Sequence, residues 1–151
     1  MDLAFSGNFK YTVDSKGRVN IPAPFRSQVS DNTFHITYGP NTSLFVYPRE
    51  RFKEFSMNLE RSYGSLASSD EERRYLLKVM YDAHPSRCDQ QGRIIIPKQH
   101  LEHAKIEKEV LIIGVVSRIE FWNPDIFEEF MNNGSLSNNE LIKRFGGADR
   151  L

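Results

Sequence analysis

The sequence predicts an α+β fold that is mainly β and is built from two similar halves. The main observation is a duplication, because the motif DSKGRVNIP at residues 14–22 returns 75 positions later as DQQGRIIIP at residues 89–97. The same offset aligns Phe52 with Phe127, so the repeat extends well beyond the motif. Short stretches of alternating polar and apolar residues, which are typical of strands, accompany both motifs. Since halves of this size fold poorly alone, we expect them to share one interlocked core.

Each motif is predicted to be a tight turn followed by a short strand. The carboxylates of Asp14 and Asp89 can accept hydrogen bonds from backbone N–H groups just downstream, and Gly17 and Gly92 can adopt the positive φ that a tight turn often requires. The next residues alternate as in a strand, which the closing proline ends. In the second copy residues 94–96 are all isoleucine, so both faces of that strand are apolar and we expect it to be the more deeply buried.

The first copy should contain three further strands, one helical turn and one longer helix. The predicted strands are residues 8–13, 33–37 and 44–47. The helical turn at residues 24–29 should place Phe25 in the core and leave Arg26 free. A helix is predicted to begin at Pro48, because proline is favoured in the first helical turn. One face of this helix carries Phe52, Phe55 and Leu59.

The copies are predicted to be joined by a linker and a connecting helix. Small residues at 64–69 form the linker, and Ser69 with Glu72 has the spacing of a capping box. The apolar stripe of the connecting helix consists of Tyr75, Leu76, Val79, Met80 and Ala83.

The second copy should repeat the elements of the first. We expect a short helix at residues 98–104, strands at 110–116 and 118–122, and a helix that Asn123 caps. Beyond residue 132 the chain is polar and is predicted to be mobile or weakly helical. The predicted division is a first repeat at 1–64, a linker and connecting helix at 65–80, a second repeat at 81–131 and a tail at 132–151.

Composition limits the class of protein. Twenty basic and twenty acidic residues give a net charge of zero, which counts against a generally basic nucleic-acid binder. Any DNA contact should therefore come from a local patch, or from several weak patches combined by oligomerisation. Cys88 is the single cysteine, which excludes an internal disulfide and suits a reducing cytoplasm. No stretch has the pattern of an export signal or a membrane span, so we expect no membrane partner.

Both motifs and their spacing resemble the bacterial MraZ family. The likeness includes Phe5-Ser6-Gly7, residues 44–48 and Phe121-Trp122, and it covers roughly residues 1 to 130. The resemblance implies a duplicated AbrB-like (SpoVT-AbrB) swapped-hairpin fold, also called a double-split β-barrel, with short flanking helices. It also implies a homo-oligomeric ring and a transcriptional regulator of the division and cell-wall gene cluster.

Arg18 and Arg93 are the leading candidates for DNA contact, because a guanidinium can donate two hydrogen bonds to guanine O6 and N7. The alternative is that each arginine pairs with the aspartate of its own motif and only holds the turn. Lys16 suits a phosphate contact, and its equivalent Gln91 could contact adenine or phosphate. Weaker candidates for phosphate contact, which could equally be solvated surface cations, are Lys10 and Arg26. The first copy carries more of these cations, so we expect it to be the principal reader.

Other reactive side chains favour ordinary structural roles. His100 and His103 could share a metal with Glu107, but no further ligand has suitable spacing, and a solvated helix face is favoured. Cys88 has no activating base beside it and is expected to be a half-buried thiol. No nucleophile motif or glycine-rich phosphate loop is present. We therefore expect no catalytic residue, no metal and no cofactor.

Two functions from different classes follow. The first is a sequence-specific DNA-binding regulator that acts in the cytoplasm at the nucleoid, as a ring whose subunits contact direct repeats in promoter DNA. The second is an antitoxin-like protein-interaction module without direct DNA contact, which the neutral charge also suits.

Overall fold

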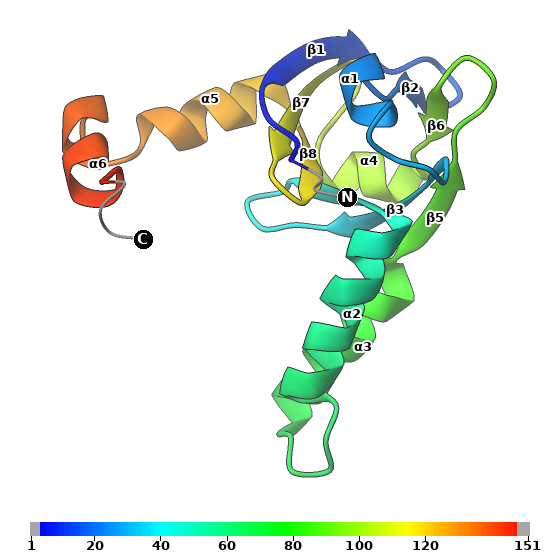
Figure 1. The fold of residues 1–151 in the computed structure, drawn as a ribbon, viewed down its shortest axis with the longest axis vertical. Helices are drawn as coiled ribbons and strands as arrows, with labels where there is room; N and C mark the ends of the chain where they lie inside the picture. Colours follow the sequence, from blue (N-terminus) through cyan, green and yellow to red (C-terminus); the bar gives the residue numbers. More distant parts are fainter. Residues whose placement is uncertain (1–3, 148–151) are drawn as a thin grey trace.

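The computed structural model describes residues 4–147, which form an α+β fold dominated by antiparallel strands (Figure 1). The strands are β1 (Asn8–Thr12), β2 (Arg18–Asn20), β3 (Thr33–Tyr38), β4 (Leu44–Pro48), β5 (His84–Arg87), β6 (Arg93–Ile95), β7 (Glu109–Val115) and β8 (Arg118–Trp122). The helices are α1 (Ala23–Arg26), α2 (Arg49–Tyr63), α3 (Asp70–Asp82), α4 (Lys98–His103), α5 (Pro124–Asn132) and α6 (Asn138–Phe145). The predicted strands and helices are present, and β5 is an additional strand.

The strands form two sheets that interlock the two copies. Six strands pair in the order β1-β7-β8-β4-β3-β5, and β2 pairs with β6 in a separate two-stranded sheet. The 75-residue offset converts β1 into β5, β3 into β7 and β4 into β8, so the six-stranded order reads the same from either end. β1 of the first copy pairs with β7 of the second, and β5 of the second pairs with β3 of the first. This confirms the duplicated fold, although the ladders of the described residues leave β1 and β5 as edges and do not close a barrel.

The pseudo-twofold axis passes through both sheets. Phe45 pairs with Glu120 at the centre of the β4–β8 ladder, and Val19 pairs with Ile94 at the centre of the β2–β6 ladder. Each of these pairs joins two equivalent positions of the duplicated sequence. Val19 and Ile94 are both buried in the one hydrophobic core to which both copies contribute. Neither half could bury this surface alone, which explains why the copies interlock.

The expectation that β6 is more deeply buried than β2 is wrong. Ile94 and Ile96 are buried, but Ile95 is 53% exposed, and β6 has the same burial pattern as β2. A two-stranded sheet that covers the core has only one apolar neighbour, so its outer face remains in solvent whatever residues it carries. Three consecutive isoleucines therefore do not mark two buried faces here.

The helices outside the sheets follow their predicted capping signals. Ser69 Oγ accepts a hydrogen bond from Glu72 N at 3.1 Å, and the Glu72 carboxylate accepts one from Ser69 N at 2.9 Å, which confirms the capping box of α3. Helices α2 and α3 pack as a hairpin that projects from the sheets, and α5 leads to α6 on another side (Figure 1). The tail contains a helix, since a second capping box at Ser137 and Glu140 begins α6.

Candidate nucleic-acid interface

The two motifs fold into turns with the same backbone hydrogen bonds. Gly17 and Gly92 both have φ of +80°, which an L-residue rarely adopts. Asp14 Oδ1 accepts from the backbone N–H groups of Lys16 and Arg18, at 2.9 and 2.8 Å. Asp89 Oδ1 accepts the two equivalent bonds from residues 91 and 93, both at 2.9 Å. The duplicated sequence thus produces two copies of one aspartate-closed turn.

Each motif arginine forms an ion pair with the aspartate of its own turn. The Nε of Arg18 lies 2.6 Å from Asp14 Oδ2, and the Nε of Arg93 lies 2.9 Å from Asp89 Oδ2. Backbone donation from the arginine, followed by its side-chain hydrogen bond, lowers the pKa of both aspartates below the ordinary value. Within residues 4–147 these guanidinium groups have side-chain hydrogen bonds through Nε only, which leaves both Nη groups of each for a ligand. The pair that holds the turn is therefore compatible with bidentate DNA contact.

The β2–β6 sheet places both arginines on one surface. Arg18 lies opposite Ile95 and Asn20 lies opposite Arg93, and in an antiparallel ladder opposite residues share a face. The side chain of Arg18 is 32% exposed and that of Arg93 is 25% exposed. We call this outer surface of the two-stranded sheet, formed by Arg18, Asn20, Arg93 and Ile95, the reading face.

Each turn is fixed by the strand of the other copy. Ile96 N donates to Gly17 O, and Ile21 N donates to Gly92 O, both at 2.9 Å. In addition, Asn20 Nδ2 donates to Gln91 O at 3.1 Å. The relative position of the two turns is therefore set by direct hydrogen bonds between the copies, so the reading face is a single preorganised surface.

Arg26 is not free, contrary to expectation. Its Nε donates to Ile21 O at 2.9 Å, and a Cβ placed on Gly92 would lie 2.5 Å from its Cζ. Arg26 therefore lies against the turn of the second copy, because β2 and β6 pair antiparallel and the end of each strand lies beside the turn of the other copy. Its equivalent Leu101 lies beside Gly17 of the first turn, with Cδ1 3.7 Å from a Cβ placed there.

This arrangement removes the expected surplus of charge at the first turn. Lys16 places its positive charge at the first turn. Arg26 belongs to the first copy, but its guanidinium lies against the second turn. Gln91 is exposed at the tip of the second turn, as Lys16 is at the first. Lys10 is exposed on β1, which belongs to the six-stranded sheet and not to the reading face.

The predicted solvated face of α4 is wrong for His100. This residue is 1% exposed, and its Nε2 lies 2.8 Å from Asp82 O. Burial lowers its pKa. His103 stacks on Tyr38, with ring centroids 4.3 Å apart. No group of three or more histidine, cysteine, aspartate or glutamate side chains is placed to hold a metal within residues 4–147.

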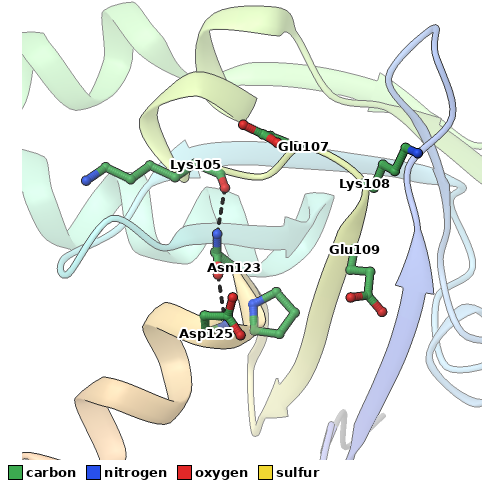
Figure 2. Close-up of a pocket in the computed structure, with 7 residues that line it drawn as sticks. Lys105, Glu107, Lys108, Glu109, Asn123 and Asp125 are labelled. Carbon is green, nitrogen blue, oxygen red and sulfur yellow. Dashed lines mark hydrogen bonds between the residues drawn. The ribbon is translucent and has the colours of Figure 1, made fainter.

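A hollow of about 650 Å³ lies away from the reading face, between the loop before β7 and the start of α5 (Figure 2). Asn123 bridges its walls, since its Nδ2 donates to Lys105 O at 2.7 Å and its Oδ1 accepts from Asp125 N at 2.8 Å. The Oδ1 atom of Asn123 thereby caps α5. The lining carries more carboxylates than amines, so it does not suit an anionic ligand. Its lining residues are Lys105, Glu107, Lys108, Glu109, Asn123, Pro124 and Asp125.

Two members of the reading face, Asn20 and Ile95, are not among the DNA-contact residues predicted from the sequence, although Asn20 is predicted to share a strand face with Arg18. The signal was present, because alternation places Asn20 on the face of Arg18 and the 75-residue offset converts Asn20 into Ile95. The apolar character of Ile95 concealed it, since three isoleucines suggested two buried faces.

Comparison with known proteins agrees with the resemblance noted in the sequence. The model of a family described as "MraZ protein, putative antitoxin-like" matches residues 4–75 and 80–145. The chain belongs to the MraZ family. Family members named transcriptional regulator MraZ include a protein from Thermoanaerobacter pseudethanolicus that is 40% identical over 138 residues, which is 91% of this chain and 93% of the relative.

Two further family members with the same name extend the comparison. The protein from Pediococcus pentosaceus is 40% identical over 126 residues, which is 83% of this chain and 85% of the relative. The protein from Finegoldia magna is 36% identical over 146 residues, which is 96% of this chain and 99% of the relative. In addition, none of the helices in residues 4–147 has the length and apolar character needed to cross a bilayer.

Proposed function

We propose that the protein is a transcriptional regulator that binds double-stranded DNA sequence-specifically through the reading face. The observation that carries the proposal is the presence of Arg18 and Arg93, one from each copy, on a single rigid surface with Nε held by an aspartate. A guanidinium held in this way can donate its two Nη groups to guanine O6 and N7 in the major groove. The names of the relatives, transcriptional regulator MraZ, support the same function.

The remaining candidates position the protein on the DNA. Lys16 and Gln91 at the tips of the turns contact phosphates beside the bases, because both are exposed and adjacent to the arginines. Arg26 supports the second turn through its contact with Gly92 and adds positive charge there. Lys10 on β1 contributes at most a peripheral phosphate contact.

A chain with no net charge needs several copies to bind DNA firmly. We propose a homo-oligomeric ring whose reading faces meet successive direct repeats in the promoter of its own division and cell-wall gene cluster, at the nucleoid in the cytoplasm. Exposed apolar side chains on the projecting helices are candidates for the subunit contacts, since such clusters commonly mark protein interfaces. They include Leu77, Tyr81, Ile142 and Phe145.

The proposal is tested by titrating the protein against the upstream region of its own gene cluster and against a scrambled fragment of equal length. Measurements at about 50 and 200 mM salt should show weaker binding of both fragments at the higher salt, with a preference for the promoter that persists. Equal affinity for the two fragments would refute sequence-specific binding. Light scattering at micromolar concentration should show an oligomer, and a stable monomer would refute the ring.

A second candidate is an antitoxin-like protein-interaction module, which the family description and the exposed apolar side chains of α3 and α6 both favour. In that case the apolar surface binds a different protein and the arginine–aspartate pairs only hold the turns. No DNA binding at any salt concentration, together with a monomeric state, would support this candidate over the first.

A further inference from the structure

Ile95 is an exposed isoleucine on a surface that otherwise carries polar and charged side chains. It is 53% exposed and lies directly opposite Arg18 in the β2–β6 ladder, with Asn20 and Arg93 completing the face. The neighbours of Ile95 on either side, Ile94 in β6 and Ile96 just after it, are the residues that this segment contributes to the core. The exposed position thus has no evident role in packing.

The backbone at Ile95 is fixed by a hydrogen bond to a buried side chain. The Ile95 N–H donates to Ser86 Oγ at 3.0 Å, and Ser86 is itself buried. A β-branched side chain on a strand has few rotamers, so little conformational entropy is lost when a ligand covers it. Ile95 therefore has the character of a preorganised apolar contact.

We propose that Ile95 contacts the C5-methyl group of a thymine in the major groove, next to the guanine that Arg18 contacts. This inference rests on the proposed DNA-binding function. The thymine methyl is the apolar group that base edges present in the major groove. Opposite side chains in a ladder have Cβ atoms about 5 Å apart, and base pairs stack about 3.4 Å apart, so this thymine lies one or two steps from the guanine.

The contact gives the reading face a direction. The pseudo-twofold axis relates Ile95 to Asn20, whose amide instead donates to Gln91 O. One end of the face therefore presents an apolar group beside an arginine, and the other presents an amide. A surface of this kind distinguishes the two orientations of a DNA site, which suits direct repeats better than palindromes.

The test uses the promoter fragment with every thymine replaced by deoxyuridine, which removes the methyl groups and keeps the base-pairing groups. Wild-type protein should bind the substituted fragment about fourfold more weakly for each contacted methyl that is lost. Ile95→Asn, which copies the equivalent residue Asn20, should bind the two fragments equally. Ile95→Val should retain part of the difference, and Leu66→Asn, at an exposed loop residue off the reading face, should behave as wild type.

Three outcomes would overturn the inference. Wild-type protein could be indifferent to the methyl groups, or Ile95→Asn could retain the full difference. The third is a change in the oligomeric state of Ile95→Asn in light scattering, which would place Ile95 between subunits. If wild-type protein does not prefer the promoter to the scrambled fragment, both the proposed function and this inference fail. If it prefers the promoter but is insensitive to the thymine methyl groups, only this inference fails.

Discussion

The two turns of the reading face share one backbone and differ in the side chains around it. Both use an aspartate to bind the same two backbone N–H groups and the same arginine Nε. They differ at the tip, where Lys16 corresponds to Gln91, and on the outer face, where Asn20 corresponds to Ile95. Duplication thus preserved the geometry that presents the arginines, while the surrounding positions diverged enough to make the surface directional.

A third difference lies beneath the turns. Arg26 packs against Gly92, whereas its equivalent Leu101 packs against Gly17, so each turn rests on a side chain from the opposite copy. The cation of one copy thereby supports the turn of the other. The two halves cannot be treated as independent DNA-binding units, and the predictions below are ways to separate or equalise them.

The largest effect should come from the arginines. Arg18→Ala should abolish the preference for promoter over scrambled DNA, because a bidentate contact with a base contributes about 1–3 kcal/mol and is lost in every subunit of a ring. Since both turns have the same geometry and similar exposure, Arg93→Ala should cause a comparable loss. The measurement is the ratio of the affinities for the two fragments.

Two controls accompany the arginine variants. Lys16→Ala should weaken binding to both fragments and make the slope of log affinity against log salt shallower by about one unit. Lys10→Ala, off the reading face, should leave the preference for promoter unchanged. Each variant must retain the wild-type oligomer. An Arg93→Ala ring with undiminished preference would identify the first turn as the sole reader and contradict the equivalence argued above.

The next effect should appear in stability, at the turn glycines. Both have positive φ, so alanine is strained at either position by about 1–3 kcal/mol. In Gly17→Ala the new Cβ would lie 2.7 Å from the backbone oxygen of Ile96, whereas in Gly92→Ala it meets the flexible end of Arg26. Gly17→Ala should therefore lower the free energy of unfolding in urea by more than Gly92→Ala does.

A double-mutant cycle tests the contact between Arg26 and the second turn. Arg26→Ala should relieve the clash in Gly92→Ala, so the double variant should be less destabilised than the sum of the single variants. Simple additivity would show that Arg26 does not occupy the space over Gly92.

A smaller effect concerns acid stability. The pKa values of Asp14 and Asp89 are lowered by the hydrogen bonds from their own turns. A lowered pKa in the folded state adds stability above the unfolded value of about 3.9, and this stability is lost as the pH falls through the folded pKa. The double variant Asp14→Asn with Asp89→Asn should therefore have a lower urea midpoint at pH 7 and lose less between about pH 4.5 and 3.

Asp31→Asn provides the matched control, because hydrogen bonds to Thr33 also lower the pKa of Asp31 while Asp31 lies outside both turns. It should change the acid dependence of stability in the same direction and leave DNA binding intact. Equal acid sensitivity of wild type and the double variant would show that the turn aspartates are not ionised partners of the folded state.

Local sequence chemistry predicted much of the fold and of the site. The turns at Asp14 and Asp89, the capping box at Ser69 and the strand pairs of each copy all depend on neighbouring residues. The exposure of Ile95 could have been predicted from its equivalence to Asn20, but the position of Arg26 could not, because it depends on which copy's strand lies beside which. That pairing joins residues 75 positions apart, and no local pattern reports it.

Position 100 offers the smallest and most direct comparison of the two copies. His100 is the equivalent of Phe25, and each is the buried residue of the short helix of its copy, α4 and α1 respectively. The sequence offset could have predicted this burial. Tyr38, His84 and His103 face His100, and its Nε2 is bonded to Asp82 O.

His100→Phe should make the second copy resemble the first. Burial lowers the pKa of His100, the neighbouring His84 and His103 lower it as well, and the hydrogen bond to Asp82 O together with the Asp82 charge opposes them. Because the folded pKa lies below the unfolded value of about 6.5, stability is full above that value and falls as the pH drops towards the folded pKa. Phenylalanine does not titrate, so the variant should lose less stability between about pH 7 and 5, although His35, whose pKa burial also lowers, retains a share.

Urea unfolding at the two pH values measures the difference. At pH 7 the variant should be about 1–2 kcal/mol less stable, since it loses the hydrogen bond to Asp82 O and places a larger ring in a packed site. The reciprocal variant Phe25→His places an imidazole between Phe5 and Phe9, where it lacks such a partner, so it should be less stable still and should lose more at low pH. If wild type and His100→Phe lose equal stability on acidification, His100 is not held neutral in the core, and the pH dependence in this range originates elsewhere.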